Sequence, residues 1–266
     1  MCLIVFGWHA HRDFPLILGA NRDEFLDRPS RTAGFWPEQP DLLAGRDLRN
    51  GGTWLGVTRI GRIAAVTNYR QGTVRSDLRS RGLLVTGFLA GDRSPKAHLA
   101  TVAVERGAYD GFNLIAGDGR ELCYFSNRGN EPQPVSPGVH GLSNALLDTP
   151  WPKVERAKSA LTRLLDRDRD ALVDGLLAVL ADRAQPADHE LPSTGVSLQW
   201  ERCLSPVFIA SPDYGTRCST VLLVDRHGNV TFVERSFDHA TGNTTDAVYG
   251  FALSSATAGA VGPVST

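Results

Sequence analysis

The chain has 266 residues, an apolar fraction of 42%, a charged fraction of 21% and a formal net charge of −1. This composition is ordinary for a globular protein with a sizeable core, and the length suits one large domain. A nearly neutral chain with scattered arginines lacks the basic face that binds phosphates, so we expect no nucleic-acid partner. We expect a single domain over residues 1–253 and a flexible C-terminal tail over residues 254–266, which are rich in Ala, Ser, Gly and Thr.

The N-terminal segment and the cysteines indicate the cellular compartment. Gly7, His9 and Asp13 interrupt the apolar start, and no basic segment precedes it, so we expect neither a signal peptide nor a membrane span. The cysteines show no Cys-x-x-Cys spacing and no disulfide framework, and they lie at positions 2, 123, 203 and 218. We therefore expect a cytoplasmic protein without a zinc site of that type. The sequence is silent on oligomeric state.

The first part of the chain predicts strands arranged in hairpins. A polar turn separates the first two apolar runs, which predict a hairpin that places the chain start within a sheet. Asn50-Gly51-Gly52 predicts a turn, whereas the prolines at 29, 37 and 40 predict an irregular loop. The strands predicted in this part are residues 2–8, 15–20, 53–58 and 62–68.

Apolar residues at helical spacing predict helices in the middle of the chain, and Ser94 before Pro95 is the clearest start signal. These helices are expected at residues 80–90, 95–105, 151–165 and 170–181. Residues 184–200 are expected to form a loop. Further strands are expected at residues 112–116, 121–125, 139–144, 207–210, 217–224 and 230–237. Hairpins at both ends with helices between them favour antiparallel sheets covered by helices over an alternating parallel fold.

The second residue, Cys2, is a candidate nucleophile. A small residue at this position allows the initiator methionine to be removed, which leaves a thiol and a free α-amine on the same residue. An α-amine titrates near ~7.7, so it can take the thiol proton and later return it to a leaving group. The alternative is that Cys2 is a small apolar residue opening a strand. The other three cysteines are expected to be structural.

Polar residues follow several predicted strands, at Asn21–Glu24, Asn68–Arg70, Ser143–Asn144 and Arg217. Taken singly, the asparagines are also explained as turn residues and Arg217 as a surface cation. Together they resemble the NRDE family, named for the tetrapeptide that occurs here as Asn21-Arg22-Asp23-Glu24. The matching stretches also include Met1–Ile4, Gly45–Asp47, Asn50–Gly56, Thr67–Arg70, Gly141–Asn144 and Tyr214–Arg217.

This family resembles the N-terminal nucleophile hydrolases, which include bile-salt hydrolases and penicillin V acylases. These relatives also begin with Met-Cys and cleave a non-peptide amide bond. The resemblance implies an α+β fold, a four-layer αββα sandwich of two antiparallel sheets, in agreement with the order of the predicted elements.

The resemblance also implies a role for each site residue. Cys2 is the implied nucleophile with its α-amine as base, and Asp23 accepts a hydrogen bond from that amine. Asn68 and Asn144 steady the oxyanion and orient the amine, and Arg217 keeps the site electropositive. The residues expected to contribute to binding are Asn21, Arg22, Trp54 and Tyr69, with aromatic rings either lining an acyl pocket or filling the core.

One departure from the relatives concerns Arg22. Their motif is Arg-Asn-x-Asp, whereas this chain has Ala20-Asn21-Arg22-Asp23. Strand alternation would point Arg22 away from the direction of the relatives' arginine. The interpretation weighed beside binding is that Arg22 is structural and pairs with Asp47 or Glu24.

The implied function is a cysteine amidohydrolase that cleaves a linear C–N amide bond of a small or acylated molecule through an acyl-thioester, with no cofactor required. The alternative implied by the family is a non-catalytic protein that handles haem or lipid, although the sequence has no haem motif. His9 and His11 lie on one face of an extended segment, but a solvated turn is the favoured explanation and no metal site is expected. The substrate depends on loops 28–52 and 184–216, whose conformation no pattern fixes.

Overall fold

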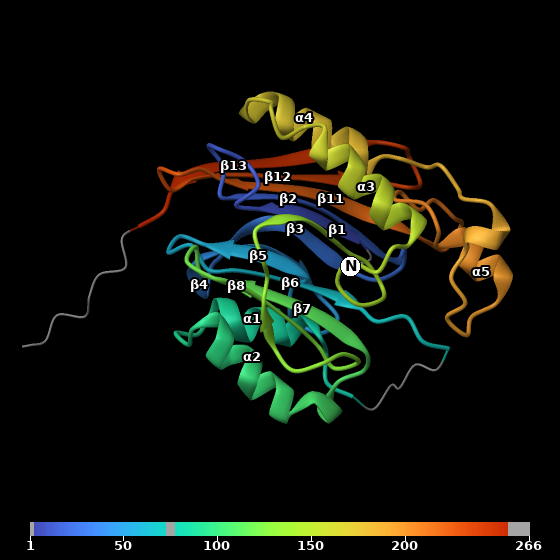
Figure 1. Cartoon of the computed structure of the whole chain (residues 1–266), viewed down its shortest axis with the longest axis horizontal. Coiled ribbons are helices and arrows are strands. Elements are labelled where there is room, and N and C mark those ends of the chain that lie inside the picture. The colour runs from blue at the N-terminus through green and yellow to red at the C-terminus, as the bar shows by residue number, and fades with distance from the viewer. Residues whose placement is uncertain (1–2, 73–77, 255–266) are drawn as a thin grey trace, which may run out of the picture.

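Two antiparallel sheets lie face to face, and helices cover both outer faces (Figure 1). This computed structural model describes residues 3–72 and 78–254, so Cys2 and most of the predicted C-terminal tail lie outside the described residues. The arrangement is the four-layer αββα sandwich of the α+β class, and the predicted fold class is confirmed. Within the described ranges, no helix combines the length and the apolar character needed to cross a membrane.

The first sheet has six strands, and one of its interior strands consists only of apolar residues and glycine. The first described strand, β1, lies between β10 and β2, because an uninterrupted apolar run is buried on both faces. Its register places Leu3 opposite Asn21 on one side and Ile4 opposite Leu142 on the other. The spatial order is β10 (Gly138–Leu142), β1 (Leu3–Trp8), β2 (Leu16–Phe25), β11 (Tyr214–Val224), β12 (Asn229–Phe237) and β13 (Thr244–Ala252).

The second sheet has seven strands, two of which fall where an irregular loop was predicted. That prediction was wrong because each proline sits where no ladder hydrogen bond is lost. Pro29 precedes the first of these strands, Pro37 lies in the turn, and Pro40 comes before Leu42, where pairing to the next strand begins. The order is β3 (Ser30–Trp36), β4 (Gln39–Asp47), β5 (Leu55–Thr58), β6 (Ile63–Asn68), β7 (Phe112–Gly117), β8 (Leu122–Ser126) and β9 (Gln133–Pro134).

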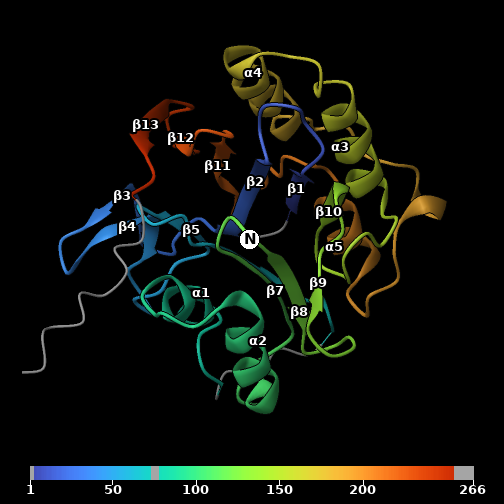
Figure 2. The same cartoon turned by 60° about the vertical axis from the view of Figure 1, so that its left-hand side comes forward.

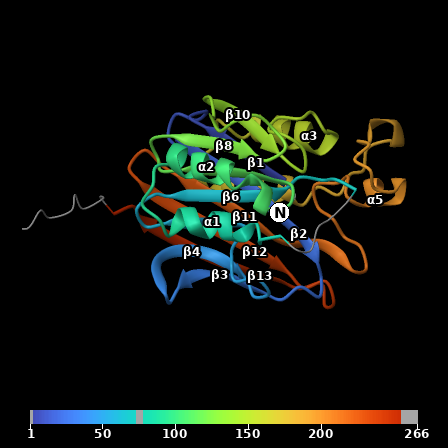
Figure 3. The same ribbon diagram turned by 90° about the horizontal axis from the view of Figure 1, so that it is seen from below.

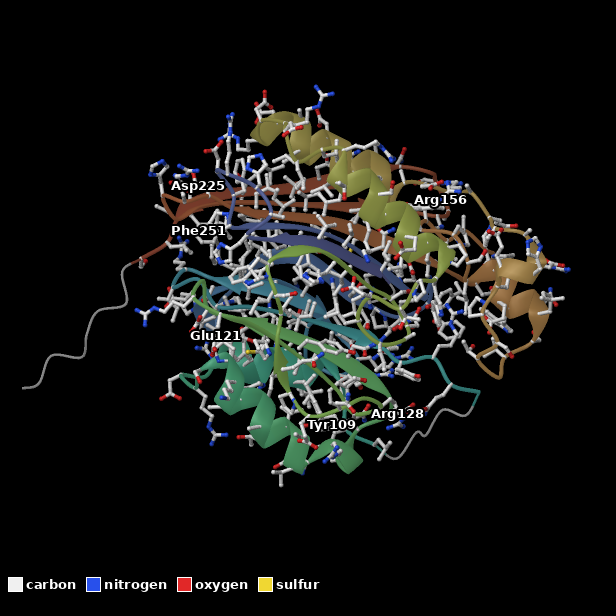
Figure 4. The ribbon with its side chains drawn as sticks, viewed as in Figure 1. Tyr109, Glu121, Arg128, Arg156, Asp225 and Phe251 are labelled. Carbon is white, nitrogen blue, oxygen red and sulfur yellow. The ribbon has the colours of Figure 1, made fainter. Side chains whose placement is uncertain are left out.

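Three apolar clusters hold the four layers together. Alternate residues of β1, namely Ile4, Phe6 and Trp8, face the cluster between the sheets, where side chains fill the space (Figure 4). Helices α1 (Gly82–Leu89) and α2 (Pro95–Val104) cover the seven-stranded sheet (Figure 3). Helices α3 (Pro152–Thr162) and α4 (Arg169–Leu180) cover the six-stranded sheet (Figure 2). All four helices lie within the predicted ranges to one or a few residues.

Other segments also differ from the sequence expectation. Residues 184–200 contain the 3₁₀ helix η2 (Asp188–Glu190) and the start of α5 (Leu198–Cys203). Residues 207–210 form no strand and make only an isolated bridge from Ala210 to Gly215. The strand was predicted from the apolar side chains of 207–209, which are buried without being paired in a sheet. The edge strand β13 was not predicted, although Ala247, Tyr249 and Phe251 alternate along one half-buried face and the two aromatic rings pack against the cluster between the sheets.

Asn21 ties two outer segments to the first sheet. Its Nδ2 donates to the carbonyls of Leu180, at the end of α4, and Val207, both at 2.8 Å. Its Oδ1 accepts from Ser219 Oγ at 2.6 Å, and the side chain is fully buried. Because these partners lie on the helical side of β2, Asn21 points away from the space between the sheets.

We predict that Asn21→Ala lowers the free energy of unfolding by about 2 to 4 kcal/mol, because it leaves two buried carbonyls without their donor. Urea denaturation would measure the change. Asn130→Ala, at an exposed turn position, is the matched control and should change stability by less than about 0.5 kcal/mol. Equal stability of the two variants would contradict the anchoring role.

Candidate active site

Two hydrogen bonds join the two sheets where β6 and β10 end. Thr67 Oγ1 donates to the carbonyl of Ser143 at 2.7 Å, and Asn144 Nδ2 donates to the carbonyl of Asn68 at 2.9 Å. Asn144 is buried, and Arg70 further holds it by donating from its backbone N–H to the Asn144 carbonyl at 2.7 Å. The structure therefore brings Asn68 and Asn144 together, although they are far apart in sequence.

A second layer of buried polar residues supports this junction. Asn113 on β7 donates through Nδ2 to Thr67 Oγ1 at 3.0 Å and to the Ala145 carbonyl at 2.9 Å. Tyr124 donates to Asn113 Oδ1 at 2.8 Å, and burial raises the pKa of its hydroxyl to about 12, so the donor keeps its proton. Asn113 and Tyr124 were not predicted as site residues. A lone asparagine inside the apolar strand 112–117 is the signal that could have found the first.

Asp23 lies on the other side of β1. It is buried on β2, opposite Thr216 in the register, and Thr216 Oγ1 donates to its Oδ1 at 2.6 Å. The same hydroxyl accepts from the Ile209 N–H at 2.9 Å, which orients the hydroxyl proton toward the carboxylate. Thr216 was not predicted as a site residue, although it stands next to Arg217 in a matching stretch.

The registers show how these groups flank the start of β1. Asn21 is opposite Leu3, so β2 continues past Leu3 with Arg22 and Asp23. Leu142 is opposite Ile4, so the chain after β10 continues past Leu3 with Asn144. Asp23 on β2 and Asn144 just after β10 consequently flank the same end of β1, and the bond from Asn144 brings Asn68 of the second sheet to this end.

Arg217 has a structural task in this arrangement. Its Nη1 donates to the carbonyls of Phe25, Leu26 and Arg28 at 3.0, 3.0 and 3.1 Å. Burial, followed by the charge of Arg22, lowers the pKa of its guanidinium. Arg217 therefore fixes the turn after β2, and it lines a separate hollow beside Phe237–Ala240 rather than the two cavities described below.

Arg22 is buried in the inter-sheet space and is 4% exposed. Its guanidinium lies 4.3 Å from the centre of the Trp54 ring, and Nη1 donates to Ser30 Oγ at 3.4 Å. The interpretation that Arg22 pairs with Asp47 or Glu24 was wrong, because Arg28 occupies both carboxylates. Arg28 bonds Asp47 through two nitrogens at 3.2 and 2.7 Å and approaches Glu24 at 3.6 Å.

Two cavities meet at Asn68. The first has a volume of about 290 Å³ and is rich in charged side chains, and the second, of about 240 Å³, has a largely apolar and aromatic wall. Both cavities are lined by Asn68, Arg81 and Asp110. Of the expected binding residues, Arg22 and Trp54 line the first cavity and Tyr69 lines the second, whereas Asn21 lines neither. The rest of the aromatic and apolar wall is formed by Val196, Trp200, Leu204 and Tyr214.

His11 and two of the described cysteines, Cys123 and Cys218, have structural surroundings. His11 accepts from the N–H groups of Asp13 and Phe14 through Nδ1 and contacts the Arg167 carbonyl through Nε2, so both ring nitrogens serve a turn. Burial raises the pKa of the Cys123 thiol to about 11. Burial, followed by Glu234, also raises that of Cys218. The part of the chain that the structure describes contains no cluster of three or more His, Cys, Asp or Glu residues able to hold a metal ion.

The fold and the site define an α+β sandwich protein with a polar junction at the start of an interior strand. The model of the Transport and Golgi organisation 2 family matches residues 1–239, and the chain belongs to this family. This is the family that the Asn21–Glu24 tetrapeptide and its companion stretches indicated.

Relatives and solved structures extend the comparison. A Transport and Golgi organization protein 2 homolog of Bos taurus is 43% identical over 261 residues, covering 89% of this chain and 93% of the relative. The Homo sapiens homolog is 41% identical over 257 residues with the same coverage. Among solved structures, a Caenorhabditis elegans N-acylethanolamine-hydrolyzing acid amidase ortholog is similar over 84% of this chain and 92% of that chain, with a TM-score of 0.49 and 11% identity.

We predict that Gly45→Ala displaces the Trp54 ring on which Arg22 packs. A Cβ at this position would lie 2.5 Å from Trp54 Cη2, and the ring cannot retreat because Arg22 covers it. The variant should lose about 1 to 3 kcal/mol of stability in urea denaturation.

Gly107→Ala is the control for this variant, because no heavy atom lies within 4 Å of an added Cβ there. It should leave stability within about 0.5 kcal/mol of the parent. If Gly45→Ala behaves like the control, the packing of Trp54 is looser than the structure indicates.

Proposed function

We propose that this protein is a cysteine amidohydrolase that cleaves a linear, non-peptide amide of a small or acylated molecule. The observation that carries the proposal is the placement of Asp23 and Asn144 on the two neighbours of β1, just past Leu3. Cys2 is joined to Leu3 by one peptide bond, and we assign the nucleophile to its thiol and the base to its α-amine.

The proposed reaction needs no group beyond these residues and water. The α-amine takes the thiol proton, and the thiolate attacks the amide carbonyl to give a tetrahedral oxyanion. The C–N bond then breaks as the α-ammonium returns the proton to the departing amine, which leaves an acyl-thioester. Water, deprotonated by the same amine, attacks the thioester and releases the carboxylic acid and the free thiol.

Asn68 is the proposed oxyanion donor. Its side-chain amide makes no hydrogen bond to any other described residue, and it borders both cavities. Asn144 donates from its Nδ2 to the Asn68 carbonyl. We therefore propose that Asn144 positions Asn68 and does not itself contact the oxyanion. A preorganised donor of this kind contributes on the order of 10² to 10³ in rate.

Asp23 is the proposed anchor of the α-amine. Its carboxylate is buried, and Thr216 fixes one oxygen with a bond of 2.6 Å. A carboxylate held in one orientation can hold an amine in one orientation and favours its protonated form during the reaction. Asp23 therefore acts through the amine and does not touch the substrate in this mechanism.

A second candidate function is the non-catalytic binding of haem or a lipid on the same fold. The exposed apolar residues beside the second cavity favour it, since Phe25 is 50% and Trp200 41% exposed and both pack on Tyr214. A thiol that accepts no acyl group, together with saturable binding of haem or a fatty acid, would favour this candidate over the first.

We predict that protein freed of Met1 gains the mass of one acyl group when it is incubated with an activated acyl ester. Intact-protein mass spectrometry would measure the adduct. Cys2→Ala should gain none, and Asn68→Ala should form it about 10² to 10³ more slowly.

Cys203→Ala is the control, because Cys203 is the described cysteine that is not buried. It should label like the parent protein. An adduct that persists in Cys2→Ala, or the absence of any adduct on trimmed protein, would contradict the proposal.

A further inference from the structure

Arg22 is a buried cation whose contacts within the described residues include no carboxylate at ion-pair distance. Its contacts are the Trp54 ring at 4.3 Å and the Ser30 hydroxyl at 3.4 Å. Burial of a guanidinium is costly unless an anion or several acceptors compensate it. One weak hydrogen bond and one aromatic face leave most of its five N–H donors to be satisfied by whatever enters the adjoining cavity.

The nearby carboxylates are committed elsewhere. Arg28 holds Asp47 through two bonds and approaches Glu24. Asp110 accepts from Gln71 Nε2 at 2.6 Å and from the Gly111 N–H at 2.8 Å. Glu234 on β12 accepts from the Ala33 N–H at 2.6 Å. Burial raises the pKa of the Glu234 carboxyl, so its negative charge is less favoured and compensates the Arg22 charge less effectively.

The cavity that Arg22 lines has an excess of cations. Its wall carries four arginines at positions 22, 28, 79 and 81 against three acids at positions 24, 47 and 110. It shares Asn68 with the second cavity, whose exposed wall is mainly apolar and aromatic. Of the charged residues in that second wall, Arg70 is neutralised by Glu201 at 2.7 Å, and Arg81 and Asp110 are common to both cavities. A molecule that fills both cavities is therefore met by apolar side chains on one side of Asn68 and by positive charge on the other.

We propose that the substrate is an amide with an apolar acyl group and an anionic departing amine, such as an N-acyl amino acid, and that Arg22 stacked on Trp54 binds the anion. This inference rests on the proposed function. The acyl chain lies in the cavity of Tyr69 and Trp200, the scissile amide lies at Asn68, and the carboxylate meets Arg22. A planar guanidinium held flat by an aromatic ring presents paired N–H donors that match a carboxylate.

The test measures binding without turnover. Full-length protein carrying Cys2→Ala is titrated calorimetrically with N-decanoylglycine, with the neutral N-decanoylglycinamide and with sodium sulfate. We expect N-decanoylglycine to bind at least about 10-fold more tightly than the neutral amide, the effect of one charge-assisted hydrogen-bonded contact. In Arg22→Gln the two ligands should bind alike, while Arg22→Lys should retain part of the preference.

Arg106→Gln is the matched control, because Arg106 is an exposed arginine that lines neither cavity and is paired with Glu131 at 3.0 Å. It should keep the preference of the parent protein. Circular dichroism checks that each variant is folded. If Arg22→Gln does not fold, the anion preference is still tested by comparing the two ligands on the protein with Arg22 intact. The Arg22→Lys variant then tests the role of Arg22 in that preference.

Three results would overturn the inference. These are equal affinity for the charged and neutral ligands, no binding of either, or Arg22-dependent binding of sulfate without any preference for N-decanoylglycine, which would mark a site for a free anion. Equal affinities, alongside acyl-thioester formation on Cys2 of the parent protein in the labelling experiment, would remove only the anion subsite. A clear preference without any thioester would remove only the proposed amidohydrolase reaction.

Discussion

The bridge between the two sheets is the constraint on which the site depends. Apolar side chains between stacked sheets resist separation but tolerate sliding, because dispersion and hydrophobic burial have little directional preference. The bonds from Thr67 to Ser143 and from Asn144 to Asn68 are directional and fix one end of the two sheets relative to each other. Together with the bonds from Arg70 to the Asn144 carbonyl and from Asn113 to the Ala145 carbonyl, they define the separation of β6 from β10.

The same bridge explains why polar residues are buried at this end of the core. Asn113 and Tyr124 satisfy the groups beneath the junction, so that a layer of hydrogen bonds replaces a layer of hydrocarbon. A fully satisfied polar network is rigid because each broken bond leaves a buried group without a partner. On the opposite flank of β1, Thr216 does for Asp23 what Asn113 does for Thr67. On each flank a candidate site residue is therefore held in place by a residue, Thr216 or Asn113, that lines neither cavity.

Much of the fold could be predicted from the sequence because it follows from local patterns. The apolar run of β1, the helical spacing of α3 and the cap at Ser94 are each encoded within a few residues. The strands at 30–36 and 39–47 were not predictable in this way, since prolines are compatible with strands only when the pairing partner and register are known. The edge strand β13 is defined by pairing to β12 rather than by its own exposed side chains.

The candidate site divides along a similar line. The motif residues Asp23, Asn68 and Asn144 were predicted from the resemblance, and the two asparagines are joined by a hydrogen bond. What could not be read from sequence is which partner each side chain chooses. Arg217 bonds the carbonyls of a turn, Asn21 faces the helical layer, and Arg28 takes the acids considered for Arg22. These choices depend on which face of a strand is turned inward and on bulges such as the one beside Arg217.

A crystal structure of Met1-trimmed protein carrying an acyl group on Cys2 tests the account most directly. The account predicts that the thioester carbonyl oxygen lies about 3 Å from the Asn68 side-chain nitrogen and that the α-amine contacts the Asp23 carboxylate. An acyl group directed away from both cavities, with the Asn68 amide bonded elsewhere, would contradict it.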